Sequence, residues 1–160
     1  MIFVTVGGQL PFDRLVHTVD QWAMNKGRED VFAQIGDSQR PPGHIQWERF
    51  LSPTEFQAKA RESDIMIAHA GMGSILTALE LGKPIVVMPR RAHLREHRND
   101  HQWATVNRLG GDVGIAIASD EEELVALLER LPELPSPTEK RSHEYARLID
   151  FLRHAMSDPE

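Results

Sequence analysis

Cysteine is absent from this chain of 160 residues. A protein without cysteine forms no disulfide framework, no thiolate zinc site and no cysteine nucleophile. The absence fits the reducing conditions of the cytoplasm, where we expect the protein to reside.

Long apolar runs and an excess of basic residues are also missing. No stretch approaches the ~18 consecutive apolar residues that a membrane-spanning helix requires, so we expect any membrane association to go through a surface or a partner. Residues 1–6 form a short apolar run without a basic leader, which predicts a first strand rather than a signal peptide. The formal net charge is -6, which argues against a partner of the nucleic-acid class, because sequence-independent binders of nucleic acid are usually basic.

The chain does contain an alternation of short apolar strands and amphipathic helices. With 41% hydrophobic residues it has the composition and size of one ordinary domain. Continuous apolar runs indicate strands buried on both faces, so we predict an α/β, Rossmann-like fold: a mainly parallel sheet with helices on both faces. The predicted strands cover residues 1–6, 31–36, 45–51, 64–68, 84–89 and 113–118, and the predicted helices lie near 12–23, after Ser52, and at 75–81, 100–109 and 120–131.

Residues 1–131 carry this pattern as the predicted ligand-binding domain. Residues 132–160 consist of a proline-rich link and a last amphipathic helix. Such a helix commonly packs on its own domain, but its apolar stripe also suits docking of a partner. The stripe consists of Tyr145, Leu148, Ile149, Leu152 and Met156.

Residues 69–74, His-Ala-Gly-Met-Gly-Ser, stand where a buried strand ends and a helix begins. Glycines at a helix N-terminus leave backbone N–H groups accessible at the positive end of the helix dipole, which suits a phosphate or diphosphate. A tight turn with Ser74 as a plain N-cap would give the same sequence. A second glycine turn, Gly7-Gly8, follows the first strand. Both turns come at the carboxyl ends of strands, where parallel sheets bind their ligands, and this favours the phosphate interpretation.

Several motifs along residues 1–118 occur together in the order of a known family. They are VTVGGQ at 4–9, QIG at 34–36, HAGMGS at 69–74, Glu80, GKP at 82–84, VMPR at 87–90 and DHQ at 100–102. In this arrangement the chain resembles the C-terminal, donor-binding half of family 28 glycosyltransferases. It is similar above all to short single-domain members: the cytosolic subunit of the dolichol-linked N-acetylglucosamine transferase and the small subunits of bacterial exopolysaccharide glycosyltransferases. The resemblance implies one half of a GT-B enzyme that binds a UDP-sugar.

The resemblance also assigns roles to residues at matching positions. The turn at 71–74 would hold the diphosphate, and the first glycine turn would approach it from the neighbouring strand. Glu80 would accept hydrogen bonds from the ribose hydroxyls, and Gln102 would read the donor sugar. His69 would bond the loop backbone or donate to a phosphate oxygen. The expected substrate contacts are Gly7, Gly8, Gln9, His69, Gly71, Met72, Gly73, Ser74, Glu80, Arg90, Arg91, Asp100 and Gln102.

A basic run follows the fifth predicted strand. Arg90, Arg91, Arg95 and Arg98 stand against Glu96 alone. Such clusters are commonly solvated. A loop at the carboxyl end of a strand lines the crevice, however, so we expect these arginines to meet an anion: the leaving diphosphate, a uronic-acid donor or a lipid-linked diphosphate.

Sugar transfer with inversion needs a base for the acceptor hydroxyl and stabilisation of the leaving UDP. The resemblance places the base and the acceptor site in the other half of the two-domain members. On this chain Asp13 and His17, near the first glycine turn, are the candidates for a catalytic base. Histidines at 93, 97 and 101 recur every four residues without a carboxylate pattern to complete a ligand set, so we predict no metal and no cofactor beyond the UDP-sugar substrate.

The leading hypothesis is the UDP-sugar-binding subunit of a two-chain inverting glycosyltransferase. It would extend a polyprenyl-diphosphate-linked sugar in exopolysaccharide or capsule synthesis. A membrane-anchored subunit would bind the acceptor and hold the chain at the inner face of the membrane. The alternatives are a non-catalytic enhancer that stabilises such a partner and a stand-alone nucleotide-binding or hydrolytic domain.

Overall fold

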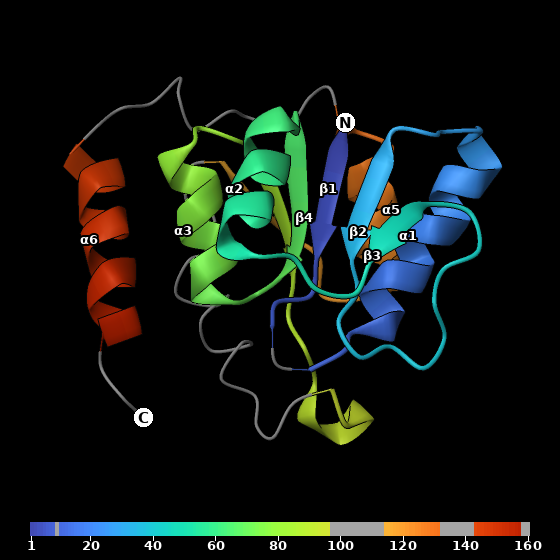
Figure 1. The fold of residues 1–160 in the computed structure, drawn as a ribbon. Coiled ribbons are helices and arrows are strands. Elements are labelled where there is room, and N and C mark those ends of the chain that lie inside the picture. Colours follow the sequence, from blue (N-terminus) through green and yellow to red (C-terminus); the bar gives the residue numbers. More distant parts are fainter. Residues whose placement is uncertain (9, 97–113, 132–142, 158–160) are drawn as a thin grey trace.

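The computed structural model describes residues 1–8, 10–96, 114–131 and 143–157, and in these residues six parallel strands form one sheet between layers of helices (Figure 1). The spatial order is β3-β2-β1-β4-β5-β6, and every neighbouring pair is parallel. The predicted parallel α/β fold is therefore confirmed. The strands are β1 (Ile2–Thr5), β2 (Val31–Gln34), β3 (Gln46–Glu48), β4 (Ile65–His69), β5 (Ile85–Met88) and β6 (Ile115–Ile117).

The direction of strand addition reverses at β1. This strand pairs with β2 on one side and with β4 on the other, and Thr5 is in register with both Gln34 and Ala68. In open parallel sheets, ligands bind outside the carboxyl ends of the strands at such a switch point. The segments after β1 and β4 leave the sheet side by side there.

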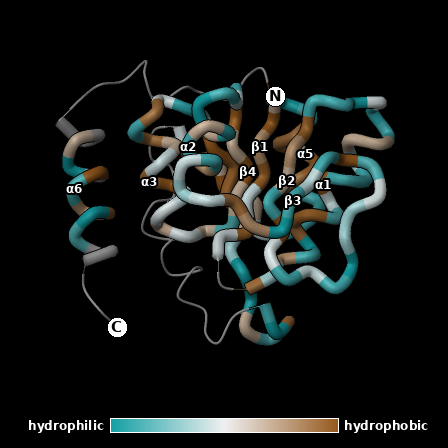
Figure 2. Tube along the Cα trace, viewed as in Figure 1, coloured by the Kyte–Doolittle hydropathy of each residue, from teal (hydrophilic) through white to brown (hydrophobic). Residues whose placement is uncertain are grey.

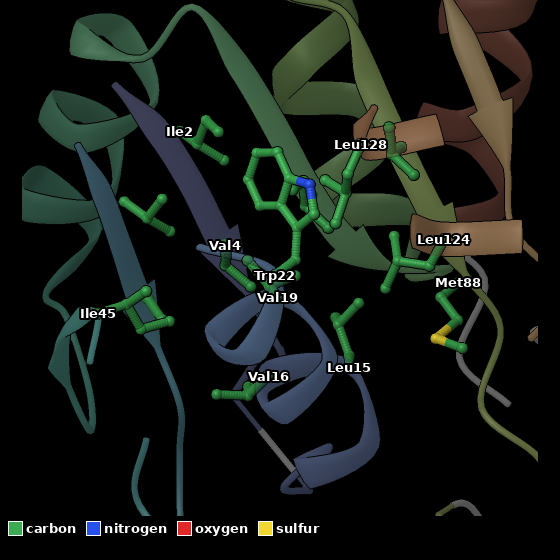
Figure 3. Packing of buried hydrophobic residues seen from close by; sticks show 14 of the residues in the cluster. Ile2, Val4, Leu15, Val16, Val19, Trp22, Ile45, Met88, Leu124 and Leu128 are labelled. Atoms are coloured by element: carbon green, nitrogen blue, oxygen red, sulfur yellow. The ribbon is translucent and has the colours of Figure 1, made fainter. Parts of the chain in front are cut away.

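Helices cover both faces of the sheet and bury an apolar core on each (Figure 1). Because successive side chains of a strand point to opposite faces, Ile2 and Val4 pack with α1 and α5, whereas Phe3 packs with α2 and α3. Figure 3 shows Leu15 and Trp22 of α1 within the first of these cores. Along the tube of Figure 2, hydrophobic residues concentrate on the strands and hydrophilic ones on the outer turns of the helices. These helices are α1 (Asp13–Lys26), α2 (Pro53–Glu62), α3 (Met72–Glu80) and α5 (Glu121–Leu128).

The start of α2 agrees with the sequence, whereas the start of α3 does not. Ser52 Oγ accepts from the Glu55 N–H (3.1 Å), and the Glu55 carboxylate accepts from the Ser52 N–H (2.8 Å), which is the predicted capping box. The sequence placed the start of α3 at Ile75, with Ser74 as a possible cap. The helix in fact begins at Met72 with Gly71 as N-cap, because Gly73 takes a helical conformation, and Ser74 lies buried in the first turn.

The last helix, α6 (His143–Ser157), lies on the outer side of α3 (Figure 1). Leu152 is fully buried in the core on this side, and Ile149 packs against the same cluster. Arg153 of α6 forms an ion pair with Glu80 of α3, with Nη2 and Oε1 2.5 Å apart. Part of the stripe thus packs on the helix's own domain. The side chains of Tyr145, Leu148 and Met156 lie outside the described part of the structure.

Two other elements depart from the sequence prediction. The third strand, expected over 45–51, is limited to three exposed residues in β3. After β5 the chain forms a short 3-10 helix, η1 (Ala92–Leu94). The helix predicted at 100–109 lies outside the described residues. Among the helices that the structure describes, none is long and apolar enough to cross a membrane.

Candidate functional site

Two glycine turns meet at the switch point, one after β1 and one after β4. Gly7 has a φ of 78°, a left-handed conformation that favours glycine, and its N–H donates to Thr5 Oγ1 (3.2 Å). Gly8 is exposed, and a Cβ there would meet no atom within 4 Å. Both turns therefore present backbone at the edge where the sequence predicted them.

The His69 imidazole lies between the two turns. A Cβ added to either Gly7 or Gly71 would lie 2.6 Å from His69 Nε2, closer than the 3.0 Å that real Cβ atoms respect. The ring thus fills space that both glycines leave open. The sequence predicted glycine here for backbone access to a phosphate, and the structure adds a second reason, because a side chain at either position would displace His69.

The N-terminus of α3 points into this edge. Gly71, the N-cap, makes no side-chain cap bond, and the first helical bond joins the Ile75 N–H to the Gly71 carbonyl (3.2 Å). The N–H groups of residues 72–74 therefore have no acceptor within the helix. No acidic side chain occupies the first turn. Such a helix start attracts an anion through its N–H groups and its dipole.

A buried polar network under the first turn was not given a role from the sequence. Gln34, at the end of β2, accepts from Thr5 Oγ1 (2.7 Å) and donates to the Gly7 carbonyl (3.0 Å) and the Arg49 carbonyl (2.8 Å). The side chain is nearly inaccessible. Its amide ties the first turn to the ends of β2 and β3. The available signal was a lone glutamine inside an otherwise apolar strand.

Replacing Gln34 by leucine is expected to lower the free energy of unfolding by about 2–6 kcal/mol. The substitution removes the partner of the Thr5 hydroxyl and of the Gly7 carbonyl, at about 1–3 kcal/mol for each group left unsatisfied, whereas the Arg49 carbonyl still accepts from the Gly36 N–H (2.8 Å). Urea denaturation measures the loss. The matched control is Gln46→Leu on exposed β3, for which we expect a change within about 0.5 kcal/mol. Equal losses in the two variants would contradict the role of the network.

A hollow of about 290 Å³ opens beside the first turn. Phe50 is 53% exposed although it is a large apolar side chain. This hollow is not predictable from the sequence, because its lining comes from separate segments of the chain. It is lined by Gly7, Gly8, Gln34, Phe50, Leu51, Pro53, Phe56 and Gln57.

Arg90 and Arg91 are engaged by backbone carbonyls. Arg90 is 2% exposed, and its Nη2 donates to the carbonyls of Val6 (2.5 Å) and Leu10. Burial lowers the pKa of Arg90 to about 10, so the guanidinium stays charged at neutral pH. Arg91 Nη2 donates to the Ser119 carbonyl (2.7 Å). The expectation that these two arginines line the crevice for an anion is thus corrected for Arg90, whose side chain lies inside the protein.

Glu96 is not an isolated acid within the basic run. Its two oxygens accept from Arg14 Nε and Nη2, both at 2.8 Å, and Oε1 also accepts from the Arg91 N–H (3.0 Å). Hydrogen bonding to Glu96 raises the pKa of Arg14. This pair anchors the segment after β5 onto α1. The one acid within the basic run is therefore paired with Arg14, which lies outside that run and also reaches Glu121.

The structure does not bring Glu80 to the glycine turns. It is the last residue of α3, eight residues after Met72, which is about 12 Å along the helix axis. Its carboxylate is paired with Arg153. A ribose contact by Glu80 would require release from Arg153.

The two candidate bases differ in their surroundings. His17 Nε2 lies 2.6 Å from the Arg40 carbonyl, so this nitrogen carries a hydrogen and does not act as a base. Asp13 is the first residue of α1, and among the described residues its Oδ1 is buried without a hydrogen-bond partner. Gln9, Asp100 and Gln102 lie outside the described residues. In the described part of the chain, no group of three or more His, Asp or Glu side chains is placed to hold a metal ion.

The fold and this edge define a class: Rossmann-like domains whose carboxyl edge suits a phosphate group. The chain belongs to the glycosyltransferase family 28 C-terminal domain, whose family model matches residues 1–152. The resemblance inferred from the motifs is therefore confirmed, and the family is one of glycosyltransferases.

Two curated relatives are the UDP-N-acetylglucosamine transferase subunit ALG13 of Homo sapiens and of Cryptococcus neoformans. The human protein is 33% identical over 107 residues, which cover 61% of this chain and 9% of the relative. The fungal protein is 32% identical over 104 residues, which cover 61% of this chain and 50% of the relative. The chain thus spans half or less of the length of these relatives.

Solved structures share the fold. The solution structure of ALG13 superimposes with a TM-score of 0.64 and 21% identity, covering 92% of this chain and 94% of that one. The crystal structure of Acinetobacter baumannii MurG gives a TM-score of 0.60 at 19% identity, and the match covers 95% of this chain and 49% of MurG. The chain corresponds to about half of the MurG chain.

Proposed function

We propose that this chain is the UDP-sugar-binding subunit of a two-chain inverting glycosyltransferase. The observation that carries the proposal is the meeting of the α3 N-terminus and the first glycine turn around His69. This arrangement offers N–H groups, a helix dipole and an imidazole to one anion. A diphosphate that leaves with UDP is the charge such an edge would stabilise.

The hollow beside the first turn would accommodate the nucleoside of the UDP-sugar. It adjoins Gly7 and Gly8, so a ligand whose diphosphate lies on the turns can extend into it. Phe50 and Leu51 offer apolar surface for a planar base, and Gln57 offers an amide for hydrogen bonds. Gln9, Asp100 and Gln102 stay assigned to the donor side of the substrate. Glu80 stays a candidate for the ribose on the condition that its pair with Arg153 opens.

The acceptor half of the enzyme is assigned to a separate, membrane-anchored subunit. ALG13, to which the chain is similar, is itself described as a transferase subunit. We propose that the partner binds a polyprenyl-diphosphate-linked acceptor in exopolysaccharide or capsule synthesis and supplies the base, with Asp13 as the weaker alternative on this chain. The partner would hold this chain at the cytoplasmic face of the membrane.

A non-catalytic enhancer is the second candidate function, and UDP binding separates the two. We expect UDP to bind the purified chain in isothermal titration calorimetry. Gly73→Val is expected to abolish this binding while the domain stays folded, because Gly73 is exposed in the first turn of α3 and a β-branched side chain there would screen the helix N–H groups.

The matched control is Ala58→Val, which places valine at an exposed position of α2. This variant should bind UDP like the unaltered chain. A folded Gly73→Val variant with unchanged affinity would show that the diphosphate lies elsewhere. Failure of the unaltered chain to bind UDP would favour the enhancer.

A further inference from the structure

We infer that Arg90 is a positioning residue that holds the first glycine turn in its binding shape from inside the protein. The inference rests on the proposed function, because the turn is there assigned to the diphosphate. It changes the role of Arg90 from a ligand contact to a support for the residues that make the contact.

The geometry of the side chain carries the inference. Arg90 follows the carboxyl end of β5, and a single nitrogen, Nη2, donates to the carbonyls of Val6 and Leu10. Val6 precedes Gly7 and Gly8, and Leu10 follows them in the sequence. One guanidinium thus fixes both ends of the turn. It does so across 84 and 80 positions of the sequence, so it links the edge of β5 to the edge of β1.

The packing of Arg90 leaves it little freedom. Its Cζ lies 5.4 Å from the centroid of the Phe12 ring, a residue that is itself buried at the start of α1. Because the side chain is 2% exposed, a bound anion would not reach its nitrogen atoms while the turn stays in place. Arg90 therefore acts on a ligand through the turn.

Burying a cation costs free energy, and the position of the Arg90 guanidinium shows how this cost is offset. A guanidinium taken out of water needs hydrogen-bond partners, and the carbonyls of the turn provide them. The charge then lies within hydrogen-bond distance of the backbone on both sides of Gly7 and Gly8. Because it is buried, salt screens it less than a surface charge. The same residue thus orders the turn and makes the edge more positive.

Three variants test the role. Arg90→Met removes both hydrogen bonds and the charge, and Arg90→Lys keeps the charge and a donor. Arg28→Met is the control: Arg28 also lies over an aromatic ring, that of Trp22 at 5.3 Å, but it precedes β2 at the opposite end of the strands. UDP affinity is measured by calorimetry. Hydrogen–deuterium exchange of the peptide that covers residues 5–12 is measured without ligand.

We expect Arg90→Met to weaken UDP binding at least tenfold and to speed exchange in residues 5–12 severalfold. Arg90→Lys should recover part of both, and Arg28→Met should change neither.

Unchanged exchange in a folded Arg90→Met variant, with or without loss of affinity, would overturn the inference, and so would an Arg90→Lys variant that behaves like Arg90→Met. If Arg90→Met does not fold, the Arg90→Lys variant decides. UDP affinity and protection of residues 5–12 from exchange that are lower than in the unaltered chain would support the role, and values equal to those of the unaltered chain would contradict it. If the unaltered chain does not bind UDP, the proposed function fails, while the exchange comparison still decides whether Arg90 orders the turn.

Discussion

Gly71→Ala is expected to weaken UDP binding at least tenfold, a loss of about 1.4 kcal/mol. The added methyl group overlaps the His69 ring, and the ring also lies close to Gly7, where a Cβ would come within 2.6 Å of Nε2. The ring must leave its place between the two turns, and the turns lose the spacing that a diphosphate needs. Overpacking of this kind also costs about 1–3 kcal/mol of stability, which thermal unfolding would register.

A double-mutant cycle with His69→Ala isolates the cause. If the clash with the ring is the reason, Gly71→Ala should add little further loss once the ring is gone. Gly43→Ala is the control glycine, because a Cβ there would meet nothing within 4 Å. Independent, additive losses from Gly71→Ala and His69→Ala would refute the assignment of His69 as the spacer between the turns.

The purified chain alone is expected to transfer no sugar to a lipid-linked acceptor, with activity appearing when membranes that contain the partner are added. The physical reason is that His17 Nε2 is engaged by the Arg40 carbonyl, that Asp13 Oδ1 is buried, and that the turns supply only stabilisation of the leaving group. Radiolabelled UDP-sugar and extracted lipid acceptor measure the transfer. Robust transfer without the partner would contradict the two-chain proposal and favour a complete enzyme.

The outer side of α6 is the surface to test for contact with the partner. Removal of the whole helix would be misleading, because Leu152 is fully buried and α3 would be uncovered. Phe151, which is 42% exposed, can be changed to serine without entering the core. We expect Phe151→Ser to reduce activity of the mixture at least severalfold while UDP affinity stays unchanged. Unaltered activity of the mixture would move the contact away from α6.

The fold and the position of the site were predictable because they depend on local patterns. Continuous apolar runs such as 64–68 and 84–89 fix a parallel sheet buried on both faces. Glycines that follow such runs mark the carboxyl edge. Ser52 and Glu55 show their capping role within four residues of sequence. Each of these signals is read within one element and requires no knowledge of what packs against it.

The inner support of the site could not be predicted in the same way. In the sequence, Arg90 is one of four arginines expected to meet an anion, and only the fold brings the Val6 and Leu10 carbonyls to it. Glu80 was assigned to the ribose by its place in the family motif. In the structure, α6 provides Arg153 as the ion-pair partner of Glu80. These roles depend on residues more than 70 positions away, so they cannot be predicted from a local sequence pattern.

The central position of β1 in the sheet has a consequence for how the protein folds during its synthesis. β1 is synthesised before both of its neighbours, β2 and β4, so one of its sides stays uncovered until residues 65–69 have been synthesised. Pairings between distant segments form late in folding, because loop closure must precede them. Both turns of the candidate site, and the imidazole between them, depend on this long-range pairing of β1 with β4. A nascent chain that ends before α3 would therefore expose an apolar strand edge to chaperones and would bind no nucleotide.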